Sequence, residues 1–278
     1  MQTKKLLIAA VILVSFSLLT ANLSAQEKQS GTTYIPEVGQ QGKDVVWVPT
    51  PQELVNKMLE IARVTADDYV IDLGSGDGRT VITAAKLGAK ALGIEYNPDM
   101  VALSKENARK EGVSEKAEFI KADLFETDFS KATVITMFLL PEINLKLRPK
   151  LLDLKPGTRI VSNTFTMGEW EADQEVTTDE NWNSWNTGYL WIIPAKVEGT
   201  WKLGKGELIL TQEFQFIHGT FNSGGKLQTI TDGRLSGDSI NFSIGFEKYT
   251  GRVADKIIKG TATNVAEGSK WDWIATKQ

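Results

Sequence analysis

The pattern of apolar and polar positions divides the chain into regions of different texture. From about residue 45, apolar residues recur first at helical spacing, over residues 51–64, and then in a short uninterrupted run, Tyr69–Leu73. This alternation of strand and helix patterns continues to about residue 165. The further predicted strands are residues 91–96, 117–123, 132–140 and 154–165, and the further predicted helices are residues 79–88 and 98–112.

Several of these predicted strands are apolar throughout, which is typical of a parallel sheet covered by helices on both faces. Residues 170–178 and 187–195 follow, and their pattern predicts an antiparallel hairpin that closes the sheet. The sequence therefore predicts an α/β domain over residues 45–195, with a mostly parallel sheet.

After about residue 195 the helical spacing stops, and apolar residues alternate with polar ones between glycine-rich turns. About six short antiparallel strands are expected in residues 196–278, forming a small β-barrel or sandwich. His218 falls in a predicted hairpin and is given no catalytic role. Trp182 and Trp185 lie in the loop NWNSWN, where they either grip a ligand or partner or pack against the second domain.

Residues 1–25 have the layout of a secretory signal peptide: a basic start, a long apolar run and small residues before Gln26. Leu23 is bulky for its place near the cleavage point, so an uncleaved N-terminal anchor is the alternative, and membrane contact is expected only through that segment. Either version exports the chain to the periplasm or beyond. Residues 26–44 are polar and are predicted to be a linker.

The composition excludes several classes of partner and of catalytic group. The 278 residues carry a formal net charge of −4, which disfavours a nucleic-acid partner. The chain has no cysteine and one histidine. Disulfides, thiol nucleophiles, cysteine-ligated metals and histidine clusters are therefore excluded, and no metal is expected.

The stretch VIDLGSGDGR, residues 70–79, places Gly74, Gly76 and Gly78 between the first predicted strand and its helix. Missing Cβ atoms let a ligand approach the backbone there, at the carboxyl edge of the sheet. The third glycine comes too early for the dinucleotide fingerprint, and no Walker lysine follows. Asp72 ahead of the turn suits a ligand with an ammonium group, such as the methionyl part of S-adenosylmethionine.

Two further acids end the next strands. Glu95 closes the second strand, 23 residues after Asp72, where a carboxylate can bridge ribose hydroxyls. Asp123 closes the third strand, where a carboxylate can accept from an adenine amino group. Three polar features on successive strand ends are much more specific than a glycine-rich turn alone.

With these residues in view, the sequence resembles class I S-adenosylmethionine-dependent methyltransferases over roughly residues 45–170, through VIDLGSGDGR, GIEYNP, ADLF and MFLLP. VPTP at residues 48–51 followed by DLGSGDGR is similar to the mitochondrial-type lysine methyltransferases of ATP synthase c-subunit and the adenine nucleotide translocator. The resemblance implies a Rossmann-like, mostly parallel seven-stranded sheet, with S-adenosylmethionine as cofactor. It implies cofactor contacts from Asp72, Gly74, Ser75, Gly76, Gly78, Glu95, Asp123 and Leu124. It places Thr50, Phe138 and Pro141 near the methyl group.

The expected acceptor is an amine, and a protein lysine is favoured by the resemblance. Apolar walls would keep a lysine uncharged for attack, and Phe138, Leu139, Leu140, Pro141 and Trp170 are the candidates, with ordinary core packing as the alternative. Asn163 either orients the acceptor or is a structural amide. The competing functions are a non-catalytic ligand- or protein-binding module on this scaffold, and an N-methyltransferase for a small molecule or lipid headgroup.

Overall fold

The computed structural model describes residues 34–179 and 185–278. The predicted signal peptide and Trp182 lie outside these residues. No helix in the described part of the chain is long and apolar enough to cross a membrane.

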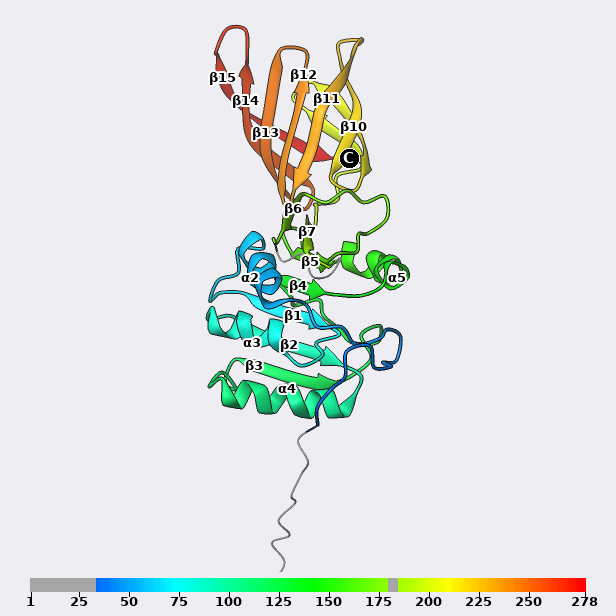
Figure 1. Cartoon of the computed structure of the whole chain (residues 1–278). Helices are drawn as coiled ribbons and strands as arrows, with labels where there is room; N and C mark the ends of the chain where they lie inside the picture. The colour runs from blue at the N-terminus through cyan, green and yellow to red at the C-terminus, as the bar shows by residue number, and fades with distance from the viewer. Residues whose placement is uncertain (1–33, 180–184) are drawn as a thin grey trace, which may run out of the picture. The chain divides into compact units, whose positions relative to one another are not determined.

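A seven-stranded sheet with the strand order β3-β2-β1-β4-β5-β7-β6 forms the first part of the fold (Figure 1). Its strands are β1 (Tyr69–Leu73), β2 (Lys90–Glu95), β3 (Ala117–Lys121), β4 (Val134–Met137), β5 (Arg159–Asn163), β6 (Gln174–Thr177) and β7 (Thr187–Ile192). The pairs among β1 to β5 are parallel, whereas β7 runs antiparallel to both β5 and β6. The predicted α/β fold with its closing hairpin is confirmed.

Among the described residues, four helices cover the two faces of this sheet: α2 (Gln52–Ile61), α3 (Arg79–Lys86), α4 (Pro98–Lys110) and α5 (Pro141–Leu152). One buried core joins residues of α2, α3 and α4 to the sheet, and a second joins α5 to the opposite face. The sequence pattern did not reveal α5. Its core-facing side includes the fully buried Asn144, and Pro149 lies inside it, so the apolar period is weak.

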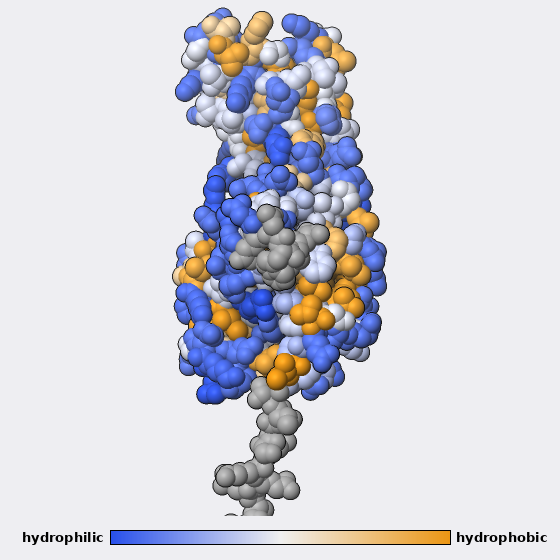
Figure 2. All heavy atoms as spheres, in the orientation of Figure 1, coloured by the Kyte–Doolittle hydropathy of each residue, from blue (hydrophilic) through white to orange (hydrophobic). Residues whose placement is uncertain are grey.

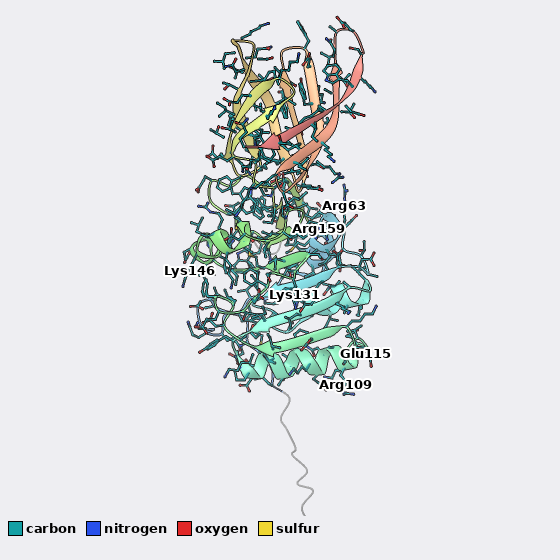
Figure 3. The ribbon with its side chains drawn as sticks, turned by 180° about the vertical axis from the view of Figure 1, so that it is seen from behind. Arg63, Arg109, Glu115, Lys131, Lys146 and Arg159 are labelled. Carbon is teal, nitrogen blue, oxygen red and sulfur yellow. The ribbon has the colours of Figure 1, made fainter. Side chains whose placement is uncertain are left out.

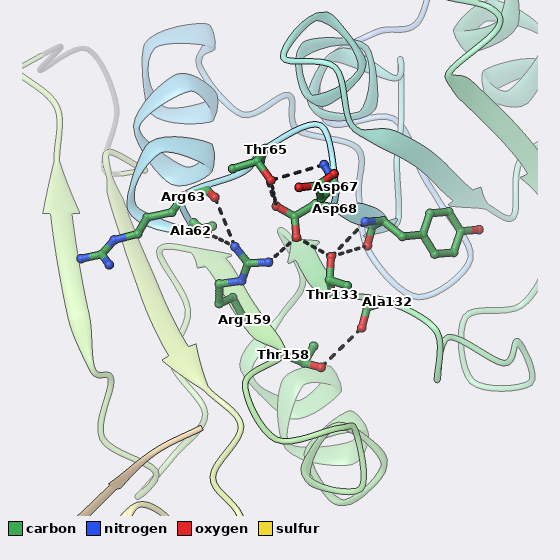
Figure 4. Close-up of polar contacts among 10 residues, drawn as sticks. Ala62, Arg63, Thr65, Asp67, Asp68, Ala132, Thr133, Thr158 and Arg159 are labelled. Carbon is green, nitrogen blue, oxygen red and sulfur yellow. Dashed lines mark hydrogen bonds and ion pairs between the residues drawn. The ribbon is translucent and has the colours of Figure 1, made fainter. Parts of the chain in front are cut away.

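A buried aspartate ties the edge where the parallel strands begin (Figure 4). Asp68, just before β1, accepts hydrogen bonds from the Thr133 hydroxyl at 2.7 Å and the Thr65 N–H at 2.8 Å, and it pairs with Arg159 of β5. Arg159 also donates to the carbonyl of Ala62 at 2.7 Å, and Figure 3 shows it beside Arg63 at this edge. Burial raises the pKa of Asp68, but these hydrogen bonds outweigh it and leave the pKa lowered. The network therefore fixes α2, β1, β4 and β5 at the edge opposite the strand ends that carry the predicted site.

The residues that follow β7 form a closed antiparallel barrel of eight strands. They are β8 (Gly199–Leu203), β9 (Gly206–Glu213), β10 (Phe216–Ser223), β11 (Lys226–Ser236), β12 (Ser239–Ile244), β13 (Glu247–Ala254), β14 (Ile257–Asn264) and β15 (Lys270–Lys277). Polar and apolar residues are interspersed on the surface of the barrel in Figure 2, as expected when the inward positions alone form its core.

Two expectations for this part need correction. The sequence indicated about six strands, because the pattern joined β9 to the start of β10 as one strand and gave no sign of β13. In β13 the inward positions are Tyr249, Gly251 and Val253, and the glycine interrupts the apolar alternation. Gly251 is required there, since a Cβ would lie 2.7 Å from the carbonyl oxygen of Lys259. His218 lies exposed within β10, not in a hairpin turn.

The barrel contacts the α/β part through a buried polar pair. The indole N–H of Trp170 donates to Gln215 Oε1 at 2.9 Å, and Gln215 Nε2 donates to the carbonyl of Glu171 at 2.8 Å. Phe214 stacks on Trp170 with ring centroids 5.6 Å apart. Both Trp170 and Gln215 are buried. The suggestion that Trp170 lines an acceptor pocket is therefore wrong, because its ring is used in this interface.

We expect Gln215→Ala to lower the free energy of unfolding by about 1–3 kcal/mol, because it leaves the buried Trp170 N–H without an acceptor. Urea unfolding followed by tryptophan fluorescence measures the change. Lys196→Ala is the control: it breaks an exposed ion pair with Asp153 and should cost less than about 1 kcal/mol. Equal losses for the two variants would contradict a structural role for the buried pair.

Candidate functional site

A pocket lies at the carboxyl ends of β1, β2, β3 and β4, where the predicted site residues converge. Its polar side is formed by the β1–α3 turn and by the ends of β2 and β3. Its other side is formed by residues that follow β4 and by a segment that precedes α2. Of the predicted residues, the lining includes Thr50, Asp72, Gly74, Ser75, Gly76, Glu95, Asp123, Leu124 and Phe138; it does not include Gly78, Pro141 or Asn163.

The glycine turn brings bare backbone to the pocket. Gly74 and Gly76 have φ values of +80° and +53°, which other residues rarely adopt. A Cβ on Gly76 would lie 2.6 Å from Nε1 of Trp47, so this position is also closed to larger residues by contact. The carbonyl of Gly76 accepts from the Ser104 hydroxyl of α4 at 2.7 Å. The turn is thus fixed both by its own dihedrals and by neighbouring elements.

Gly78 serves a different purpose. It is the residue before α3, with φ +85°, and a Cβ there would lie 2.7 Å from the Phe119 ring and 2.9 Å from Ser104 Cβ. The third glycine therefore permits close packing of α3 and α4 against β3, behind the pocket wall. The sequence predicted Gly78 to be part of the cofactor site because it belongs to the same motif as Gly74 and Gly76.

Glu95, at the end of β2, holds its carboxylate in one orientation. Oε2 accepts the N–H of Gly76 at 3.0 Å, and Oε1 accepts the N–H of Asn97 at 2.9 Å. Each oxygen keeps a further lone pair that can accept from a ligand hydroxyl. The carboxylate is therefore positioned before any ligand binds.

Asp72 is a buried carboxyl on the floor of the pocket, 6% exposed. Burial raises its pKa to about 7, and the nearby Glu95 and Asp77 add to the shift. The Thr136 hydroxyl donates to Oδ1 of Asp72 at 2.6 Å, and this hydrogen bond partly offsets the rise in pKa. A ligand cation beside Asp72 would favour the ionised form. The neighbouring Ser75 hydroxyl is buried and has no hydrogen-bond partner among the described residues.

Asp123, after β3, lies at the other end of the polar side and is already engaged. It pairs with Lys43, and its Oδ1 accepts the N–H of Phe125 at 2.9 Å. Both contacts lower the pKa of Asp123, and the hydrogen bond from Lys43 has the larger effect. The Asp123 carboxylate in turn raises the pKa of Lys43. The ammonium of Lys43 also lies 4.9 Å from the centroid of the Tyr96 ring. Asp123 is thus held ionised at the pocket edge.

The segment of residues 40–47 contributes a wall that the sequence did not reveal. The Trp47 N–H donates to the carbonyl of Gln40 at 2.9 Å, and the Gly39 N–H donates to the carbonyl of Trp47 at 2.8 Å. Residues 40–47 all line the pocket. In Figure 1 the chain here is blue and runs near the ends of the strand arrows. Residues 40–44 belong to the stretch predicted to be a linker. Polar composition gave no sign that Lys43 would reach Asp123.

Thr50 and Asn163 form a connected pair. Asn163, at the end of β5, is fully buried and donates from Nδ2 to Thr50 Oγ1 at 3.2 Å. The Thr164 hydroxyl in turn donates to Asn163 Oδ1 at 2.8 Å. The Thr50 carbonyl accepts from Arg79 at 2.9 Å. Asn163 therefore acts behind the wall by orienting the Thr50 hydroxyl, and only Thr50 faces the pocket.

The side of the pocket built after β4 is apolar. Its lining residues are Met137, Phe138, Leu139, Leu140, Ile143, Phe165 and Trp185. Pro141, predicted to be close to the methyl group, is instead the first residue of α5 and is exposed. Phe165 follows Thr164 at the end of β5, and Trp185 comes from the NWNSWN loop. The sequence suggested a binding role for that loop as one of two options.

The pocket offers bare backbone, fixed carboxylates and an apolar wall. Within residues 34–179 and 185–278, no group of three or more histidine, aspartate or glutamate side chains is arranged to hold a metal ion.

The raised pKa of Asp72 predicts how stability depends on pH in the cofactor-free protein. Between about pH 4 and pH 7 the folded state keeps a proton that the unfolded chain has released, so the free energy of unfolding falls as pH rises. Asp72→Asn should remove up to about 2–4 kcal/mol of this fall. Urea unfolding at several pH values measures it.

Asp67→Asn is the control for Asp72→Asn, since Asp67 is exposed in the loop before β1. That variant should keep the wild-type dependence. If Asp72→Asn shows the same fall between pH 4 and pH 7 as the wild type, Asp72 is not the group responsible.

Comparison with known proteins agrees with the geometry. The profile of the family described as ANTKMT methyltransferase domain matches residues 72–174. A protein-lysine N-methyltransferase of Saccharolobus islandicus is 46% identical over 164 residues, which cover 58% of this chain and 97% of that protein. The adenine nucleotide translocase lysine N-methyltransferase of Mus musculus is 34% identical over 117 residues, 41% of this chain and 51% of that protein.

Among solved structures, an RNA methyltransferase from Salinibacter ruber in complex with S-adenosyl-L-homocysteine is similar, with a TM-score of 0.51 and 47% identity. The match covers 54% of this chain and 96% of that one. The family resemblance inferred from the motifs is confirmed, and S-adenosylmethionine is the cofactor. The chain belongs to the S-adenosylmethionine-dependent methyltransferase family that includes the Saccharolobus protein-lysine N-methyltransferase.

Proposed function

We propose that this enzyme transfers the methyl group of S-adenosylmethionine to the Nζ atom of a protein lysine. The observation that carries the proposal is the division of the pocket into a polar side, which includes the carboxylates of Asp72, Glu95 and Asp123, and an apolar side built after β4, which has none. The first suits the cofactor, and the second suits an uncharged amine. The name of the Saccharolobus relative, which the chain matches over almost its whole length, supports lysine as the acceptor.

The residues present fit the cofactor. Asp72 can pair with the amino group of the methionyl part, which would offset the cost of burying its charge. Glu95 can accept from the ribose hydroxyls with the lone pairs that Gly76 and Asn97 leave free. Asp123 and Leu124 border the space for the adenine ring. Gly74 and Gly76 line the pocket, so the backbone of the turn borders the space for the ligand.

The bound cofactor supplies a sulfonium that already activates the methyl group. The protein must then align the acceptor nitrogen with the bond to be broken, keep it unprotonated and exclude water. The apolar side of the pocket lowers the pKa of an entering lysine, since a charged ammonium is poorly solvated there. The Thr50 hydroxyl, oriented by Asn163, has a lone pair left to accept an N–H from the amine.

RNA is the competing acceptor, because the Salinibacter structure is described as an RNA methyltransferase. Strong RNA binding draws on many lysine and arginine contacts to phosphates, whereas this chain has a net charge of −4. A lipid headgroup or small amine would also fit an apolar pocket. Methyl labelling of cell extracts separates all of these acceptors.

We also propose that residues 1–25 direct export, leaving the enzyme in the periplasm or on the membrane, and that the catalytic part spans residues 45–195 and the barrel part residues 196–278. The support for export is the order of basic, apolar and small residues. Detecting the enzyme in the periplasmic or membrane fraction of fractionated cells would support it, and finding it only in the cytosol would refute it.

We expect Glu95→Gln to weaken binding of S-adenosylhomocysteine by about tenfold or more. Both carboxylate oxygens accept backbone N–H groups, so an amide places its own N–H against one of them and also loses the charge that attracts the ribose hydroxyls. Isothermal titration calorimetry measures the affinity.

Glu106→Gln is the matched control, because Glu106 lies on α4, outside the pocket lining, and pairs with Arg109. Its affinity should equal that of the wild type. A Glu95→Gln protein that is folded and binds equally well would contradict the ribose role.

The acceptor is identified with cofactor labelled on its methyl group. Incubated with envelope and cytosolic extracts, the enzyme should place label in a protease-sensitive protein band, and hydrolysis should return it as methylated lysine. Label in the ribonuclease-sensitive fraction would identify RNA as the acceptor. Label found only in lipid or small molecules would show that the acceptor is a different amine, not a protein lysine. The Asp72→Ala variant serves as the inactive control.

A further inference from the structure

Three aromatic side chains from separate segments meet on the apolar side of the pocket. The rings of Phe138 and Phe165 stack with centroids 6.0 Å apart and planes 25° apart. Trp185 approaches Phe138 edge-on, with centroids 5.9 Å apart and planes 65° apart. All three line the pocket. We call these residues the aromatic wall.

The backbone that carries Phe165 is strained, which indicates that its position matters. Thr164 has φ +61°, unusual for a β-branched residue. The Phe165 N–H donates to the carbonyl of Asn163 at 2.6 Å, closing a turn around Thr164. Asn144 of α5 stabilises the turn by donating to the carbonyls of Phe165 and Thr166 at 3.2 Å each. Strain of this kind persists where surrounding contacts enforce it, often at ligand sites.

The described lining residues that follow β4 carry no charge; they are Met137, Phe138, Leu139, Leu140, Ile143, Phe165 and Trp185. A cation held on this side meets aliphatic side chains and ring faces, and of these only the ring faces attract it. The attraction suits methylated ammonium groups because they are weakly hydrated. Aliphatic side chains alone would make this side equally apolar but would offer no ring face to a cation.

We infer that the aromatic wall is a binding subsite for methylated ammonium groups, so that the enzyme retains a lysine through successive methyl transfers. This inference rests on the proposed function for its substrate. In each transfer the nitrogen lone pair forms the N–C bond while the C–S pair returns to sulfur, and the positive charge moves from sulfur to nitrogen beside the rings. A secondary or tertiary ammonium then loses a proton to water before the next attack. The third transfer yields a quaternary ammonium with no proton to lose.

The test measures binding to the protein saturated with S-adenosylhomocysteine. The probes are N-acetyl trimethyllysine amide and its uncharged isostere, in which carbon replaces the quaternary nitrogen. Calorimetry should give an affinity about five- to thirtyfold higher for the charged probe, the range expected of a partly desolvated cation–π contact. Phe165→Leu and Trp185→Leu should each reduce that ratio, and a separate titration with S-adenosylhomocysteine reports on the cofactor side of the pocket.

Phe246→Leu is the matched control, because Phe246 is an exposed aromatic residue of the barrel, 72% exposed. It should keep the wild-type ratio. Equal binding of the two probes by the wild type, absence of binding for both, or a ratio insensitive to Phe165→Leu and Trp185→Leu would each overturn the inference. Charge-selective binding together with label only in a small amine would uphold the subsite while refuting the protein substrate.

Discussion

The arrangement of the site depends on one constraint, the attachment of the β1–α3 turn to the end of β2. The Glu95 carboxylate accepts the N–H of Gly76, and the carbonyl of Ile94 accepts the N–H groups of Gly74 and Ser75. A turn with three residues at positive φ would otherwise have several accessible conformations, and its backbone would not present a fixed surface. Because Glu95 is both the brace and a pocket residue, folding of the turn and formation of the cofactor site are the same event.

The polar side of the pocket stores an unfavourable interaction that a ligand can relieve. Asp72 is buried with one hydrogen bond, and two other carboxylates lie near enough to raise its pKa further. By contrast, Asp68 at the opposite edge of the sheet has several donors and a lowered pKa. The same residue type thus stabilises the fold at one end of the strands and is held ready for a cation at the other. The contrast between Asp72 and Asp68 by itself indicates that the ligand site lies at the carboxyl ends of the strands.

The sequence predicted the parts of the molecule that depend on local pattern. Tyr69–Leu73 is an apolar run followed by glycines, and its strand begins and ends where expected. The predicted turn residues Gly74 and Gly76 lie at the pocket because their motif sets both the turn and its place at the sheet edge. The apolar pattern did not predict elements in which a buried position holds a residue that is not apolar. In α5 that residue is an asparagine, and in β13 it is Gly251. In both elements a tertiary contact required the residue that hid the pattern.

The rest of the site could not be predicted because its residues are brought together by long-range contacts. Lys43 and Asp123 are 80 residues apart in sequence. Phe138, which follows β4, contacts Trp185, which precedes β7, and no spacing in the chain relates them. Phe138 and Trp185 lie on the apolar side of the pocket, whereas the motif residues lie on its polar side. The motif is local and therefore predicts the reaction from the sequence, but the apolar side forms only when the fold brings distant segments together.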